Sequence, residues 1–114
     1  MRIAVVGSRN ITVDNISDYV KNADEIVSGG AVGVDQSAAE YAKQKGLKLT
    51  VFLPEYSLYG RAAPIIRNKK IVDYSDKIVA FWDARSKGTL SVIKYAKKTK
   101  KECEVIIIEP NEHQ

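Results

Sequence analysis

The chain has 114 residues and a formal net charge of +4, and 45% of its residues are hydrophobic and 28% are charged. These values indicate a single globular domain with its own core, and no apolar run approaches the roughly 20 residues of a membrane span. Because the chain also starts without the features of a signal peptide, we expect a soluble, cytoplasmic protein with no membrane association. The positive charge is compatible with an anionic ligand or with nucleic acid and does not choose between them.

Cysteine and histidine are too scarce to suggest redox or metal chemistry. Cys103 is the only cysteine and His113 the only histidine, which excludes an internal disulfide and a cysteine-based metal site. Cys103 lies beside a run of Val and Ile residues, where it would act as a small apolar filler. We therefore expect no metal site.

Apolar runs alternate with amphipathic segments from the start of the chain. Residues 2–6 and 25–28 are typical of strands buried on both faces of a sheet. Between them a helix is expected, capped by Thr12 or Asp14. The residues at helical spacing in it are Ile16, Tyr19, Val20 and Ala23. The second strand is followed by another helix, which ends at a Gly46 cap. Its apolar stripe is Val34, Ala38, Tyr41 and Ala42.

The second half of the chain continues the alternation. Strands are expected at residues 48–53, 76–82 and 104–108. One helix runs from Pro64 to about Tyr74, since proline fits the first turn of a helix. Another helix follows Thr89 as its cap. The apolar stripe of that last helix is Val92, Ile93 and Ala96.

Five strands that alternate with four helices predict the α/β class. We expect a single-domain, Rossmann-like three-layer α/β/α sandwich with a five-stranded parallel sheet and helices on both faces. The domain spans residues 1–109, with a loop at residues 55–60, and residues 110–114 form a frayed polar tail.

The stretch from Ser28 to Asp35, SGGAVGVD, joins a predicted strand to a predicted helix. Gly29, Gly30 and Gly33 permit positive φ angles and a close approach of the backbone to a ligand. The free N–H groups of the first helical turn, at the positive end of the helix dipole, would attract phosphate. The spacing matches neither the dinucleotide-binding fingerprint nor the P-loop. A tight turn that packs the helix on the sheet is the alternative explanation.

Four polar or glycine-bearing loops leave the carboxyl ends of the strands, where open parallel sheets bind ligands. They are residues 7–10, 28–35, 56–61 and 86–89. The hydroxyl groups near this edge belong to Ser8, Ser28, Ser86 and Thr89. The positive charges belong to Arg9, Arg61, Arg67 and Lys87. Hydroxyls, backbone N–H groups and positive charge together predict a site for an anion with a ribose or base attached.

Some of these residues have two explanations. Asp35 would either cap its helix or accept hydrogen bonds from a ribose hydroxyl. Tyr56, Tyr59 and Trp82 are candidates for stacking on a base, although Trp82 is also typical of a core residue at a strand end. Tyr59, beside a glycine, is the candidate for a mobile lid.

In order and spacing these motifs resemble the SLOG superfamily (SMF/DprA–LOG) of Rossmann-like proteins. The matching segments cover most of the chain: Gly7-Ser8-Arg9, residues 28–35, Arg67-Asn68, Asp76 and residues 86–89. The resemblance is closest to the small YpsA-related branch, and it implies a nucleotide or nucleotide-derived ligand and no required cofactor. The residues assigned to ligand binding are Gly7, Ser8, Arg9, Ser28, Gly29, Gly30, Gly33, Asp35, Tyr59, Arg61, Arg67, Asn68, Ser86, Lys87, Gly88 and Thr89.

The LOG branch is similar to phosphoribohydrolases that use an arginine on the third helix and a glutamate on the next one. Arg67 matches the arginine, but Val92 stands at the position of the glutamate. Hydrolysis of an N-glycosidic or phosphate bond would therefore need Asp35 or Asp83 in its place. We expect a nucleotide-binding module or sensor, with hydrolysis as the alternative.

The DprA branch binds single-stranded DNA, with a longer sheet and additional domains. A run of lysines near the end of the last predicted helix would suit a DNA backbone, although such a run is more often a solvated face. These lysines are Lys94, Lys97, Lys98, Lys100 and Lys101. Single-stranded DNA binding is therefore the second alternative. Small Rossmann domains often dimerise through helices, so a homodimer is also open.

Overall fold

The computed structural model describes residues 1–109, and the predicted tail at residues 110–114 lies outside them. The strands are β1 (Arg2–Gly7), β2 (Glu25–Ser28), β3 (Lys48–Val51), β4 (Lys77–Trp82) and β5 (Glu102–Ile107). All neighbours pair in parallel, in the order β3-β2-β1-β4-β5. The long helices are α1 (Val34–Lys45), α3 (Ala63–Tyr74) and α4 (Lys87–Lys98). The predicted α/β class with a five-stranded parallel sheet is confirmed.

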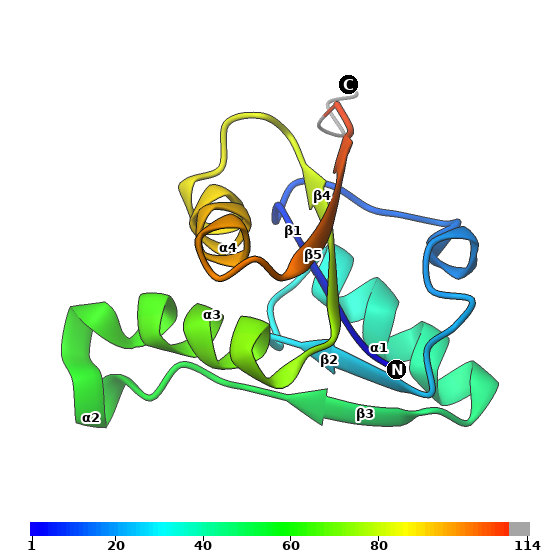
Figure 1. Ribbon diagram of the computed structural model, residues 1–114, viewed down its shortest axis with the longest axis horizontal. Coiled ribbons are helices and arrows are strands. Elements are labelled where there is room, and N and C mark those ends of the chain that lie inside the picture. The colour runs from blue at the N-terminus through cyan, green and yellow to red at the C-terminus, as the bar shows by residue number, and fades with distance from the viewer. Residues whose placement is uncertain (110–114) are drawn as a thin grey trace.

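Helices cover both faces of the sheet. In Figure 1, α1 lies on one side of the strands, and α3 and α4 lie on the other. Ile3 and Val5 of β1 point into the α1 layer, whereas Ala4 and Val6 point toward α3 and α4. All four side chains are at most 6% exposed. Because both faces are covered, the central strands are continuous apolar runs, which is why the sequence locates them.

The helix predicted between the first two strands, with Thr12 or Asp14 as its cap, is wrong. Only Ile16–Asp18 is helical in that segment, as a single 3-10 turn, η1. Asn15, just before the turn, donates a side-chain hydrogen bond to the Asp18 carboxylate at 3.4 Å. Short polar side chains of this kind compete with the hydrogen bonds of a regular helix. The apolar residues of the segment still pack on the sheet: Ile11, Val13, Ile16 and Val20 are buried.

Smaller differences concern the ends of elements. α4 begins at Lys87 with Ser86 as its N-cap residue, so Thr89 lies in the first turn and is not the cap. The predicted loop at residues 55–60 contains a one-turn helix, α2 (Tyr56–Tyr59), followed by a 3-10 turn, η2 (Gly60–Ala62). The observed ends of β3 and β5 differ from the predicted ends by one or two residues.

Candidate ligand site at the carboxyl edge of the sheet

The loops at the carboxyl edge of the sheet surround a cavity of about 540 Å³, an ordinary size for a small-molecule site. The strand order reverses here, because β2 and β3 lie on one side of β1, and β4 and β5 lie on the other. Ligands of open parallel sheets bind at such switch points. The lining residues are Val6, Gly7, Ser8, Arg9, Asn10, Gly29, Gly30, Ala31, Asp35, Leu53, Pro54, Tyr56, Pro64, Arg67, Asn68, Ile71, Ser86, Gly88, Thr89 and Val92.

Most of the predicted ligand-binding residues line this cavity, and five lie outside its lining. The five are Ser28, Gly33, Tyr59, Arg61 and Lys87. Ser28 supports the glycine-rich turn, since its Oγ accepts a hydrogen bond from the N–H of Gly30 at 3.3 Å. Tyr59 and Arg61 are exposed, and the Tyr59 ring lies 5.5 Å from the Nζ of Lys70. The structure therefore does not place the predicted lid residue Tyr59 against the cavity.

Two glycines of the turn after β2 lie where a side chain would meet neighbouring atoms, and at Gly33 the backbone conformation also favours glycine. A Cβ on Gly29 would lie 2.8 Å from the Nη1 atom of Arg67, which is closer than real Cβ atoms approach. Gly33, the N-cap residue of α1, has a φ of +77° and lies against the backbone carbonyl groups of Arg9 and Ile11. A side chain at Gly33 would push against the loop after β1, and one at Gly29 would displace the Arg67 guanidinium.

Arg67 on α3 is hydrogen-bonded to the turn after β2 and to the segment after β3, at one wall of the cavity. Its Nη1 atom donates to the Gly29 carbonyl at 2.7 Å and to the Phe52 carbonyl at 3.5 Å, and its Nε atom donates to Asn68 Oδ1 at 2.9 Å. Burial lowers the pKa of Arg67 from its usual value, yet a guanidinium remains protonated at physiological pH. Asn68, which lies on the inward face of α3 and is 8% exposed, thereby has a hydrogen-bonding partner.

Asp35 is buried at the start of α1, with 7% of its side chain exposed. Its Oδ2 atom accepts a hydrogen bond from the N–H of Ala31 at 3.0 Å. Burial raises the pKa of this carboxyl, and the N–H of Ala31, the charge of Arg67 and the N–H of Gly29 oppose that rise. Asp35 therefore both lines the cavity and closes the glycine-rich turn. The turn satisfies the N–H groups of Gly30 and Ala31 internally, so these two are not available to a phosphate.

Asp83, a candidate catalytic residue from the sequence, is not among the residues that line the cavity. Its Oδ1 atom accepts hydrogen bonds from the N–H groups of Arg85 at 2.9 Å and Ser86 at 2.7 Å, and its Oδ2 atom accepts one from the Ser86 hydroxyl at 3.0 Å. Burial alone would raise the pKa of Asp83, but these hydrogen bonds and the nearby Ser8 hydroxyl outweigh it and lower the pKa. Asp83 thus positions the loop that leads into α4.

The N-terminus of α4 is open toward the cavity. Ser86, Gly88 and Thr89 line it, and the Ser86 side chain makes no capping hydrogen bond to the helix. Within residues 1–109, no acceptor is paired with the N–H groups of Lys87, Gly88 or Thr89. The first turn of α4 also carries no acidic residue. Free N–H groups at the positive end of a helix dipole make this end of the cavity attractive to an anion.

Comparisons of the chain with protein-family models, with curated proteins and with solved structures found no match.

Within residues 1–109, no helix is both long and apolar enough to cross a membrane. In the same range, no group of three or more His, Cys, Asp or Glu side chains is placed to hold a metal ion. The chemistry of the cavity therefore rests on arginine, hydroxyl, amide and backbone N–H groups, with one carboxylate, Asp35, in its lining.

Sequence reasoning missed the apolar wall of the cavity. Leu53 and Pro54 follow β3, and Pro64 lies in the first turn of α3. Tyr56, which the sequence suggests only as a stacking candidate, completes this wall and is 61% exposed. The position of Leu53 and Pro54 just after a strand was a usable signal, because that is where the carboxyl edge lies. The placement of Tyr56 depends on α2, which no sequence pattern predicted.

Proposed function

We propose that this chain is a SLOG-type Rossmann domain that binds a nucleotide or nucleotide-derived ligand in the carboxyl-edge cavity. The observation that carries the proposal is the division of one cavity into an anion-attracting end and an apolar end. The open N-terminus of α4 lies at the first, and the segment after β3 lies at the second. A phosphate ester with an attached base matches this division of chemistry.

The phosphate belongs at α4 in this proposal. The N–H groups of Gly88 and Thr89, the Ser86 hydroxyl and the cation Arg9 would bind it. The glycine-rich turn contributes shape, because two of its N–H groups already have acceptors within the turn. Asp35 would then face the ribose, where a carboxylate accepts hydrogen bonds from hydroxyl groups.

The base belongs against the apolar wall. Leu53 and Pro54 offer apolar contact, and the largely exposed Tyr56 ring offers a face for stacking. Stacking of this kind tolerates different bases. The cavity therefore supports recognition of a nucleotide class more strongly than recognition of one particular base.

Binding without turnover is the form of the proposal that we favour. Val92 lines the cavity where a hydrolase of the LOG type would need a carboxylate, and the Asp83 carboxylate is occupied by loop hydrogen bonds. Among residues 1–109, Asp35 is the one carboxylate in the lining, and its Oδ2 atom already accepts a hydrogen bond from the N–H of Ala31. Product formation from nucleoside monophosphates that disappears with Asp35→Asn would reverse this preference.

Thermal unfolding against a ligand panel tests the proposal. The panel holds nucleoside mono-, di- and triphosphates, cyclic nucleotides, ADP-ribose-type nucleotides, the matching nucleosides and a short single-stranded oligonucleotide. A ligand present at 100 times its Kd stabilises the folded state by about 2.7 kcal/mol, enough to raise the midpoint by several degrees. We expect a rise with a phosphorylated small nucleotide. No rise with any small nucleotide would refute the proposal.

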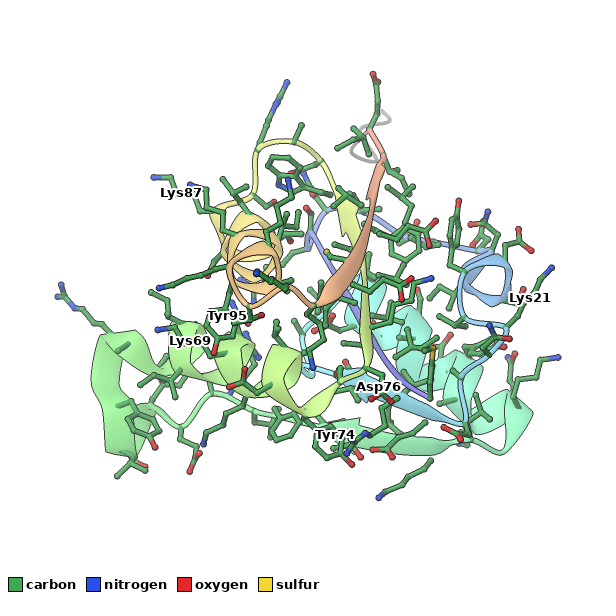
Figure 2. The ribbon with its side chains drawn as sticks, in the orientation of Figure 1. Lys21, Lys69, Tyr74, Asp76, Lys87 and Tyr95 are labelled. Carbon is green, nitrogen blue, oxygen red and sulfur yellow. The ribbon has the colours of Figure 1, made fainter. Side chains whose placement is uncertain are left out.

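A second candidate function, nucleic-acid binding, is favoured by a basic groove between α3 and α4. The groove has a volume of about 570 Å³ and is lined by Lys69, Lys87, Leu90, Ser91, Lys94, Tyr95 and Lys98. Figure 2 shows Lys69 and Tyr95 beside each other between the two helices, with Lys87 at the start of α4. Within residues 1–109, none of the four groove lysines has a carboxylate within 4.0 Å. Oligonucleotide affinity that falls steeply with salt would support this function.

A further inference from the structure

The two edges of the sheet differ in how they are protected from other strands. β3 forms one edge and β5 forms the other, and Figure 1 shows both with one side free of neighbouring strands. On β5, Glu102 and Glu104 flank Lys77, whose Nζ lies 3.6 Å and 3.3 Å from their carboxylate oxygens. Charges on an edge strand oppose pairing with another chain. β3 carries one charged residue, Lys48, and that residue lies at its first position.

The side chains of β3 that face the α1 side of the sheet are apolar and unusually exposed. Leu49 pairs in register with the buried Ile26, and Val51 pairs with Ser28, so Leu49 and Val51 share the face on which α1 packs. Leu53 continues this row, because its Cδ2 atom and the Cγ1 atom of Val51 approach the same position beside Gly30. Leu49, Val51 and Leu53 are 38%, 42% and 62% exposed. An edge strand with such a row is suited to pairing.

The row is self-complementary when two copies of β3 run antiparallel. With Val51 on the two-fold axis, Val51 lies opposite Val51 of the partner subunit, and Leu49 lies opposite Leu53 of the partner subunit. The three apolar residues of each copy then form one cluster on one face. The same orientation is needed for an isologous, closed dimer.

The charges at the two ends of the segment favour the same orientation. Lys48 precedes the row and Glu55 follows it, with side chains 68% and 52% exposed. An antiparallel pair places the Lys48 end of each copy beside the Glu55 end of the other, so opposite charges meet at both ends. Within each copy, Lys48 lies 3.9 Å from Glu25 and Glu55 lies 3.0 Å from Lys70, so the new pairs would extend existing charge networks.

We propose that two copies of this chain associate through their β3 edges, antiparallel and centred on Val51, to form one continuous ten-stranded sheet. The partner is a second copy because the apolar row and its flanking charges match their own two-fold image. Backbone hydrogen bonds between the two edges supply the ladder, and the apolar cluster fixes the register. The proposed dimer does not rest on the ligand proposed for the cavity, but Leu53 lies both in the cavity lining and at the dimer interface.

Solution mass tests the interface. Light scattering across micromolar to millimolar concentrations should give twice the monomer mass for the unmodified chain and the monomer mass for Val51→Lys, which places two like charges on the axis. Val105→Lys is the matched control, because Val105 is 36% exposed on the opposite edge strand β5, and it should remain dimeric. Circular dichroism checks that both variants are folded. A monomeric unmodified chain, or a dimeric Val51→Lys variant, overturns the proposal.

Cross-linking tests the register in a Cys103→Ala background, which removes the only native cysteine. Opposed residues of antiparallel strands have Cα atoms about 4.5–5.5 Å apart, within the range of a disulfide. Val51→Cys should therefore form a disulfide with itself on oxidation. Leu49→Cys should not, because its two copies would be displaced by roughly 13 Å along the strands, whereas a mixture of Leu49→Cys and Leu53→Cys should cross-link. A dimer without the Val51→Cys cross-link also overturns the proposal.

Discussion

Replacing Gly88 by aspartate tests whether the phosphate of the ligand lies at α4. Gly88 lines the cavity in the first turn of the helix, and a Cβ there meets no atom within 4 Å. At about 6 Å from a phosphate, the new carboxylate would be repelled by about 0.7 kcal/mol in water and by about 2.8 kcal/mol at an effective dielectric constant near 20. A repulsion energy between these two values, about 1.4 to 2 kcal/mol, would raise the Kd about 10- to 30-fold, since each 1.4 kcal/mol is a factor of ten.

Calorimetric titration separates this electrostatic effect from damage to the fold. Aspartate is favourable at a helix N-terminus and glycine is a poor helix former, so Gly88→Asp should be at least as stable as the unmodified chain. Gly88→Ala, which adds a methyl group without charge, should bind the nucleotide nearly normally. The unphosphorylated nucleoside should lose little affinity for Gly88→Asp. Equal nucleotide affinities of Gly88→Asp and Gly88→Ala, or an equal loss for the nucleoside, would refute the placement of the phosphate.

Three further predictions concern the residues that build the site. Arg67→Met leaves the buried carbonyl of Gly29 without its donor and should lower the free energy of unfolding by roughly 1–3 kcal/mol in urea denaturation; unchanged stability would contradict the bracing role. Burial raises the pKa of Asp35 above 3.8 in the folded state, so its ionisation costs stability as pH rises through the raised value, and Asp35→Asn should remove that part of the pH dependence in thermal unfolding. The pKa of Asp83 is lowered from 3.8, so its contribution is present at neutral pH and disappears as pH falls through the acidic range; Asp83→Asn should lower the midpoint of thermal unfolding at pH 7 and weaken the fall of that midpoint with acid. If the midpoint of the variant followed that of the unmodified chain at every pH, the loop would not need the charge.

The strands and the long helices could be predicted because the local pattern of apolar residues shows which of their side chains are buried. Ile3 to Val6 had to be buried on both faces, and Gly46 had to end a helix. The segment around η1 could not be predicted in the same way, since Ile16 and Val20 have helical spacing but also pack well from an irregular chain. The side chain of Asn15 competes with the hydrogen bonds of a regular helix, and the segment forms a single 3-10 turn instead.

The site could be predicted as a convergence of loops but not as a pattern of hydrogen bonds. The strand order brings Ser8, Gly29 and Gly88 to one cavity, as parallel topology requires. That Asp83 is occupied by its own loop, and that the glycine-rich turn satisfies two of its N–H groups internally, depends on side-chain positions within a few residues. Sequence spacing carries no information on these contacts, so it predicts phosphate at the glycine-rich turn after β2, whereas the proposed function places the phosphate at the N-terminus of α4.

Arg67 joins a helix to two loops that lie 38 and 15 residues away in the chain. Since the guanidinium holds these segments in the unliganded domain, their conformational entropy is lost during folding and not during ligand capture. A ligand bound as proposed would meet walls that are already in position, so most of the contact energy would remain available as affinity. Under the proposed function, substitution of Arg67 should therefore weaken ligand binding through displacement of Gly29 and Phe52, in addition to the loss of any direct contact.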